Sequence, residues 1–257
     1  MDTNLEGRVA IVTGASRGIG KSIAERLASE GMRLILAARS EAALNEIAAS
    51  CKTECHTLAI DLRLEESPHA LISYAVDKLG SIDLLVNNAG ATKRGDFLEL
   101  TEADWTDGFA LKFFSSVRCS RSAWPHLVKS NGGIINIVGI GGRTGMAEFA
   151  IGGSVNAALL NLTKVLADKG IADGVRVNAI NPGYIETDRL RSRIKAFAAG
   201  KNISDQQAAA EMAKQLGISR FGNPDEIASA VAFMASPLSS YCQGTILDVD
   251  GGQTRTL

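Results

Sequence analysis

Short apolar runs rich in β-branched residues alternate with longer Ala- and Leu-rich runs along the chain. Seven of the short runs are continuously apolar, as strands covered on both faces of a sheet are. These expected strands span 8–13, 33–38, 56–60, 83–87, 133–138, 175–181 and 245–249. The expected helices span 19–30, 41–50, 65–79, 102–129, 154–169 and 224–235. The alternation predicts a doubly wound, three-layer α/β fold with a parallel sheet of about seven strands.

No repeat, low-complexity stretch or linker divides residues 1–257, which predicts a single domain. The stretch 186–217 departs from the alternation because it is helical, charged and precedes the last strand, and we expect a lid there. Its first part, 186–201, carries five basic and two acidic side chains. Two interpretations stay open for this charge: a solvated helix face, or attraction of a carboxylate- or phosphate-bearing substrate.

The overall charge excludes several partners. The chain has 27 Lys and Arg against 28 Asp and Glu, a net charge of −1, so nothing draws it generally to nucleic acid or to a membrane. No apolar run approaches the roughly 20 residues of a membrane span. The four cysteines are too scattered for disulfides, and no His or Cys spacing suits a metal. We therefore expect reduced thiols in a cytoplasmic protein without a metal.

A glycine-rich turn, Thr13-Gly-Ala-Ser-Arg-Gly-Ile-Gly20, connects the first strand to the first helix. Gly14 permits a tight turn, while Gly18 and Gly20 allow the backbone to approach a pyrophosphate and the helix to pack on the strand. The free N–H groups and partial positive charge of the helix N-terminus favour that anion. The alternative is a turn with a structural role only. The position between a strand and a helix favours a Rossmann-type dinucleotide site.

Four motifs in the same order identify a resemblance to the short-chain dehydrogenase/reductases. They are the glycine spacing of the first turn, Asn87-Asn-Ala-Gly90, Asn181-Pro-Gly183 with Thr187, and Val249-Asp-Gly-Gly252. The resemblance covers nearly the whole chain. It implies an oxidoreductase acting on a small carbonyl or alcohol substrate. It also implies a homotetramer or dimer with helices 102–129 and 154–169 at one interface.

The cofactor preference follows from the end of the second strand. Members that use NAD usually carry an Asp there, whereas this chain has Ala38 followed by Arg39. A guanidinium suits a 2′-phosphate, and Arg17 adds a second cation, which predicts NADP(H). The alternative is that both arginines are only solvated. The residues expected to bind the cofactor are Gly14, Ser16, Arg17, Gly18, Ile19, Gly20, Arg39, Ser40, Asp61, Leu62, Asn88, Ala89, Gly90, Pro182, Gly183, Ile185 and Thr187.

The catalytic set departs from the family at all four places. The family works with Asn, Ser, Tyr and Lys, in which the Tyr phenol transfers the proton. Counting from the flanking segments puts these places at Lys112, Gly139, Gly152 and Asn156, respectively. Two glycines cannot orient an oxygen or transfer a proton, and they imply a wider cleft. Lys112 and Asn156 resemble an exchange of the usual Lys and Asn between neighbouring helices.

Three interpretations remain open. In the first, the protein is an oxidoreductase whose proton comes from water, the substrate, Lys112 or Tyr184. Lys112 is alternatively a helix residue without a site role, and Tyr184 an ordinary aromatic of the pocket wall. In the second, the protein is a catalytically inactive NADP(H)-binding sensor or partner subunit. In the third, it binds a bulky ligand in the space left by the glycines.

Overall fold

The computed structural model describes residues 3–255 and contains a sheet of seven parallel strands. The strands are β1 (Val9–Thr13), β2 (Arg33–Ala38), β3 (Cys55–Ala59), β4 (Leu84–Asn87), β5 (Gly133–Ile137), β6 (Arg176–Pro182) and β7 (Ile246–Val249). Their order is β3-β2-β1-β4-β5-β6-β7, so the direction in which successive strands are added reverses between β1 and β4. The predicted doubly wound fold is confirmed, because every expected strand is present to within two residues at either end.

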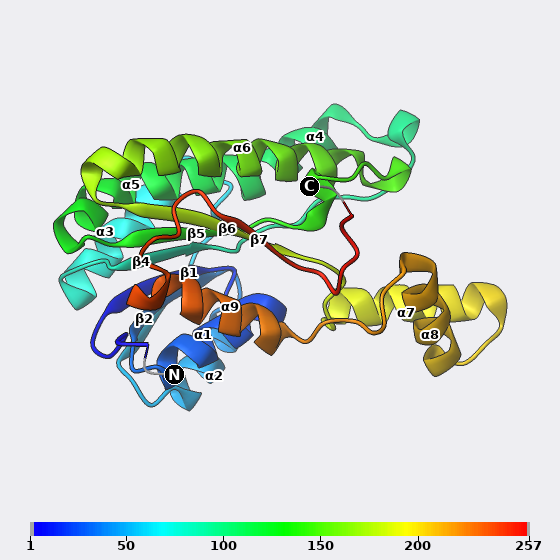
Figure 1. Ribbon diagram of the computed structural model, residues 1–257, viewed down its shortest axis with the longest axis horizontal. Coiled ribbons are helices and arrows are strands. Elements are labelled where there is room, and N and C mark those ends of the chain that lie inside the picture. Colours follow the sequence, from blue (N-terminus) through cyan, green and yellow to red (C-terminus); the bar gives the residue numbers. More distant parts are fainter. Residues whose placement is uncertain (1–2, 256–257) are drawn as a thin grey trace.

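Helices cover both faces of the sheet (Figure 1). One layer holds α1 (Gly18–Ser29), α2 (Glu41–Ser50) and α9 (Pro224–Ala235), and α1 packs against α9. The other holds α3 (Ser67–Leu79), α4 (Glu102–Gly108), α5 (Ser115–Ser130) and α6 (Ala150–Asp173), and α3 packs against α5. In this topology ligands bind beyond the carboxyl ends of the strands, near the reversal point.

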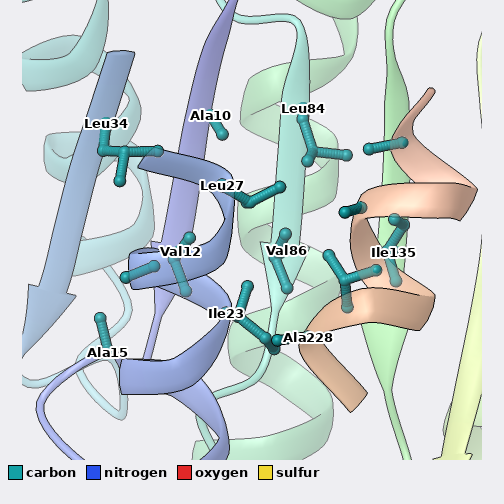
Figure 2. Close-up of a cluster of buried hydrophobic side chains, with 14 of the residues drawn as sticks. Ala10, Val12, Ala15, Ile23, Leu27, Leu34, Leu84, Val86, Ile135 and Ala228 are labelled. Carbon is teal, nitrogen blue, oxygen red and sulfur yellow. The ribbon is translucent and has the colours of Figure 1, made fainter. Parts of the chain in front are cut away.

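The core between the sheet and the α1/α9 layer is aliphatic (Figure 2). Ile23 and Leu27 of α1 are fully buried and lie over Val12 of β1 and Val86 of β4. Burying an aliphatic side chain of this size contributes about 1.5–3 kcal/mol. The packing therefore fixes α1 against the strands, and with it the glycine-rich turn at its N-terminus.

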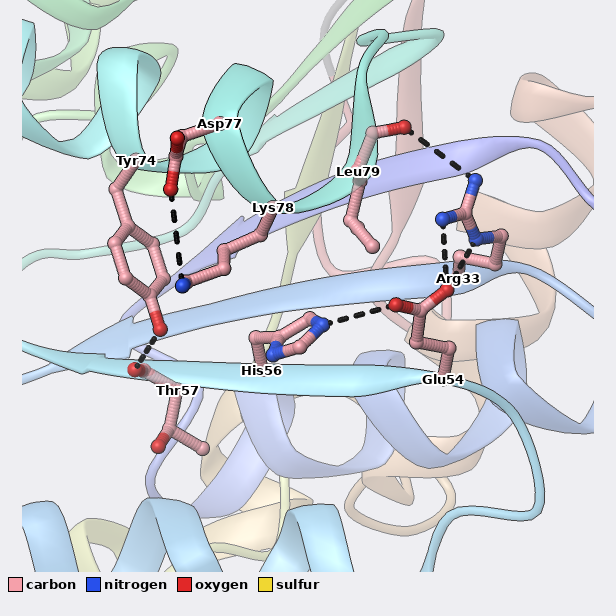
Figure 3. Close-up of polar contacts among 8 residues, drawn as sticks. All are labelled: Arg33, Glu54, His56, Thr57, Tyr74, Asp77, Lys78 and Leu79. Atoms are coloured by element: carbon pink, nitrogen blue, oxygen red, sulfur yellow. Dashed lines mark hydrogen bonds and ion pairs between the residues drawn. The ribbon is translucent and has the colours of Figure 1, made fainter.

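Polar contacts tie the edge strand β3 to its neighbours (Figure 3). Arg33 of β2 forms an ion pair with Glu54 at 2.7 Å, and Glu54 also lies 3.0 Å from the ring of His56. The pKa of Glu54 is lowered by the hydrogen bond from His56 and then by Arg33. The Tyr74 hydroxyl donates to the Thr57 carbonyl at 3.2 Å. These residues hold an exposed edge, which supports a structural role for His56.

The helix expected over 102–129 is not regular. A π-helical segment, η2 (Phe109–Phe114), separates α4 from α5. A π-helical turn contains more residues than the 3.6 of an α-helical turn, so the helical periodicity of the sequence does not predict it. Such turns are frequent at functional sites. Lys112 lies in this segment. The following helix, α6, begins at Ala150 instead of Ser154, so that Gly152 stands in its first turn.

Segment 186–217 contains α7 (Asp188–Lys201) and α8 (Asp205–Leu216), which extend from the body of the molecule in Figure 1. The two helices share a small apolar cluster of their own, formed by Leu190, Met212, Ala213, Ile218 and Phe221 with Tyr184 at its border. The segment is helical, as expected, and its role as a lid stays a prediction.

Within residues 3–255 one stretch, Ala147–Asp173, is long and apolar enough to cross a membrane, although no such run was expected from the sequence. It contains α6, which packs against β6 in the helical layer. A core helix of a soluble protein passes the same test of length and composition, so the stretch is weak evidence for a membrane span.

Candidate functional site

All residues expected to bind a cofactor lie at the carboxyl edge of the sheet. They follow the ends of β1, β2, β3 and β4 or occupy the end of β6 and the segment after it. In chain order, grouped by the strand that they follow or end, they are Gly14, Ser16, Arg17, Gly18, Ile19 and Gly20; Arg39 and Ser40; Asp61 and Leu62; Asn88, Ala89 and Gly90; Pro182, Gly183, Ile185 and Thr187. The sequence thus anticipated which segments meet at this edge.

The glycine-rich turn leaves room that side chains would close. Gly14 and Gly18 have φ of 66° and 55°, a left-handed conformation that favours glycine. A Cβ at Gly20 would overlap the carbonyl oxygen of Gly14. Arg17 begins α1 without any side-chain cap, so the first N–H groups of the helix remain available to an anion. A pyrophosphate fits this arrangement.

Thr13 connects the glycine-rich turn to the Asn-Asn-Ala-Gly segment. Its hydroxyl donates to the Val86 carbonyl at 3.2 Å and accepts from the backbone N–H groups of Asn88 and Ala89 at 2.9 and 3.0 Å. The Asn88 amide donates back to the carbonyls of Thr13 and Gly14. These bonds fix two loops from neighbouring strands against each other. Sequence analysis missed Thr13, although a polar residue ending a buried strand was a usable signal.

The side chains of Arg17 and Arg39 are exposed and form no ion pair with a carboxylate in the described part of the chain. Asp61 follows β3 and accepts hydrogen bonds from the backbone and the guanidinium of Arg63, while Leu62 is buried. Two unpaired guanidiniums therefore flank the place where the adenosine end of a dinucleotide would lie.

Lys112 and Asn156 are in direct contact. The Lys112 ammonium donates to the Asn156 side-chain oxygen at 2.7 Å and to the Val138 carbonyl at the end of β5. The Asn156 amide donates to the Gly139 carbonyl at 3.3 Å. Lys112 is half-buried, and burial of its ammonium, followed by the charge of Arg189, lowers its pKa to about 7. Two of the four residues that depart from the family pattern thus form one polar group at the expected catalytic position.

Phe149 occupies the space at the glycine that stands in the usual Tyr place. A Cβ at Gly152 would overlap the Phe149 ring, and one at Gly141 would lie 2.7 Å from it. The expectation of a wider cleft at Gly152 is therefore wrong, because an aromatic ring from three residues earlier fills the position. Gly139, in the usual Ser place, has φ of 128° and lies against Asn156.

Arginine side chains surround this centre. Arg94 stacks over Phe149, with Cζ 4.0 Å from the ring centroid, and Arg193 stacks over Tyr184 at 4.7 Å. Arg189 donates to the Gly90 carbonyl at 3.4 Å. The Tyr184 hydroxyl accepts a hydrogen bond from Arg193 at 3.3 Å. Sequence analysis missed Arg94, because nothing near it in the sequence marks it; only the charge of 186–201 pointed to Arg189 and Arg193.

Comparisons with known proteins agree over nearly the full length. The family model described as enoyl-(acyl carrier protein) reductase matches residues 14–254. The 3-oxoacyl-[acyl-carrier-protein] reductase of Vibrio cholerae is 38% identical over 253 residues, 97% of this chain and 98% of the relative. The meso-2,3-butanediol dehydrogenase of Serratia marcescens is 31% identical over 253 residues, 97% of this chain and 95% of the relative. The L-sorbose reductase of Gluconobacter frateurii, solved with NADPH and L-sorbose, is 32% identical, covers 100% of both chains and has a TM-score of 0.96.

Proposed function

The chain belongs to the short-chain dehydrogenase/reductase family, and we propose that it is an NADP(H)-dependent oxidoreductase whose proton donor is Lys112. The observation that carries the proposal is the contact of the Lys112 ammonium with Asn156 and the Val138 carbonyl, beside Gly139 at the end of β5. Lys112 is thus a titratable group in a site where Gly152 stands in the place of the usual phenol.

The cofactor is NADP(H). The L-sorbose reductase similar to this chain was solved with NADPH. The residues present suit the same molecule, because Ala38 leaves no carboxylate to repel a 2′-phosphate, and the exposed guanidiniums of Arg17 and Arg39 have no acidic partner within residues 3–255. The uncapped start of α1 would hold the pyrophosphate, and Thr187, packed over Gly18, would close the nicotinamide end.

When bound, the nicotinamide supplies or accepts the hydride. The protein then has to hold the substrate oxygen and move one proton. An ammonium has three N–H donors, and Lys112 uses two of them on Val138 and Asn156. Within residues 3–255 the third has no partner, which leaves it for a substrate oxygen. In reduction, the proton moves from Lys112 to the carbonyl oxygen as hydride reaches the carbonyl carbon. Lys112 then regains a proton from water. In oxidation, the neutral amine accepts the alcohol proton.

The pKa of Lys112 suits this role. General acids and bases are most effective when their pKa lies near the working pH, and burial together with Arg189 lowers the pKa of Lys112 to about 7. Tyr184 is the other titratable candidate, but its ring lies against the α7/α8 cluster, and within residues 3–255 no hydrogen bond connects it to Asn156 or Val138. These contacts favour Lys112.

The test combines binding with turnover. NADPH binding is measured by fluorescence titration, and NADPH oxidation is followed against a panel of carbonyl and imine compounds. Lys112→Met is expected to lower kcat by about 10²–10⁴-fold while the affinity for NADPH stays unchanged. Lys129→Met, an exposed lysine at the end of α5, is the matched control and should resemble the wild type.

Two outcomes would contradict the proposal. Turnover that survives Lys112→Met would exclude Lys112 as the proton donor. NADPH binding without turnover of any compound would instead support the alternative that the protein binds NADP(H) but is catalytically inactive. The absence of Ser and Tyr from their usual places is consistent with that alternative.

A further inference from the structure

Within residues 3–255, Arg94 and Arg193 form no ion pair with an acidic side chain, and each stacks on an aromatic ring. Arg94 lies over Phe149 and forms no hydrogen bond or ion pair with any residue of 3–255. Arg193 lies over Tyr184 and bonds only the Tyr184 hydroxyl. Both side chains are half-buried. The exposed Glu148 affects Arg94 at a distance but forms no ion pair with it.

Both arginines belong to the surroundings of the proposed proton donor. The ring under Arg94 is the one that fills the place at Gly152, and Tyr184 directly follows Gly183 at the end of β6. Arg189 links the two regions, since it bonds the Gly90 carbonyl and lies close enough to lower the pKa values of both Lys112 and Arg94. Segments that are distant in sequence thus bring positive charge to one place.

Such a cluster is unfavourable without an anion. Burial, and then the charge of Arg193, lowers the pKa of Arg94, which means that both effects oppose its charge. Stacking uses the flat face of a guanidinium and leaves its in-plane N–H groups available, except for the one that Arg193 donates to the Tyr184 hydroxyl. Those groups match the geometry of a carboxylate or phosphate and bond it in pairs.

We propose that the substrate carries an oxyanionic group, a carboxylate or a phosphate, which Arg94 and Arg193 bind while its carbonyl oxygen meets Lys112. This inference rests on the proposed function only in assuming that the substrate also has a carbonyl group that meets Lys112. The anion site itself follows from the two stacked, unpaired guanidiniums. It assigns Arg193 of α7, and Arg94 beyond the Asn-Asn-Ala-Gly segment, a role in recognising the substrate.

The experiment compares charged and neutral carbonyl compounds of similar shape. The first pair is 4-oxopentanoate and its methyl ester; the second is dihydroxyacetone phosphate and dihydroxyacetone. Binding to the complex of the protein with NADP⁺, in which no reduction takes place, is measured by calorimetry. NADPH oxidation is measured separately. Preference for the anion in the first pair identifies a carboxylate site, and preference in the second pair a phosphate site.

The variants are Arg94→Gln and Arg193→Gln. Each should weaken binding of the preferred anion about 10- to 100-fold, as expected when a hydrogen bond to a charged group is removed, and should leave the neutral compound and NADPH unaffected. Arg118→Gln is the matched control, because Arg118 also lies over an aromatic ring, Phe114 at 5.6 Å, but on α5.

The outcomes separate the two proposals. Equal binding of both members of each pair, or loss of NADPH affinity in Arg94→Gln, would overturn the anion site while leaving the oxidoreductase proposal standing. Anion binding that depends on Arg94, without reduction of any compound, would overturn the oxidoreductase proposal and support the anion site.

Discussion

Replacing Lys112 by Met changes how the stability of the protein depends on pH. Burial lowers the pKa of Lys112 from 10.5 to about 7 in the folded chain. Between these two pH values the unfolded chain holds a proton that the folded chain has released. The free energy of unfolding of the wild type therefore rises with pH in this window, by up to about 1.4 kcal/mol per pH unit. Below pH 7 both states hold the proton, and this contribution becomes constant.

Lys112→Met removes this dependence and no other titration. Met also leaves the Val138 carbonyl and the Asn156 oxygen without their donor, but that cost is the same at every pH. We expect the stability of the variant, relative to the wild type, to be highest near pH 7 and to fall by about 1–3 kcal/mol between pH 7.5 and 9.5, because only the wild type gains stability as the folded state releases its proton.

The assay is urea unfolding of the cofactor-free protein at pH 7.5, 8.5 and 9.5, at fixed ionic strength and protein concentration. Fixed concentration matters, because any association of subunits would add to the measured stability. Lys129→Met, at an exposed position, should follow the wild-type curve in parallel. Parallel curves for Lys112→Met and the wild type would refute the argument, because they would mean that Lys112 keeps an ordinary pKa in the folded protein.

Three further substitutions test other parts of the site. Gly152→Ala should lower the free energy of unfolding by about 1–3 kcal/mol in urea melts, because its Cβ would overlap the Phe149 ring, and adding Phe149→Leu should restore most of the loss. Arg39→Asp should weaken NADPH binding by about 10–100-fold in a fluorescence titration and should not weaken NADH binding. Thr13→Val should cost about 1–3 kcal/mol in the same melts, because two backbone N–H groups lose their acceptor.

The sequence predicts the scaffold well because the scaffold depends on local signals. Strands of a parallel sheet covered on both faces are mostly apolar, and seven mostly apolar runs give seven strands. The glycine-rich turn is equally local, since Gly14 and Gly18 adopt positive φ within one strand–turn–helix unit. Parallel strands then bring their carboxyl ends to one edge, so that residues from five strands meet where they were expected.

The parts that were missed depend on contacts between distant segments. In the sequence Arg94 is one charged residue in an expected loop. Its contact is with Phe149, which lies 55 positions later and packs against the guanidinium only in the folded chain. Likewise, no periodicity in the sequence shows that the helix at Lys112 widens into a π-turn. The Phe149 ring fills the space at Gly152 only in the folded chain, and counting positions from flanking motifs does not reveal this contact.

The backbone around the proposed catalytic centre does not suit the usual Ser and Tyr. Gly139 has φ of 128°, which a Ser would adopt only under strain, and a Tyr at Gly152 would overlap the Phe149 ring. Restoring the family residues by Gly139→Ser and Gly152→Tyr therefore requires the backbone and the ring to move. Because Lys112 and Asn156 are bonded to each other within the same region, the site is organised around a new polar pair. A site that had only lost its catalytic groups would require none of these adjustments.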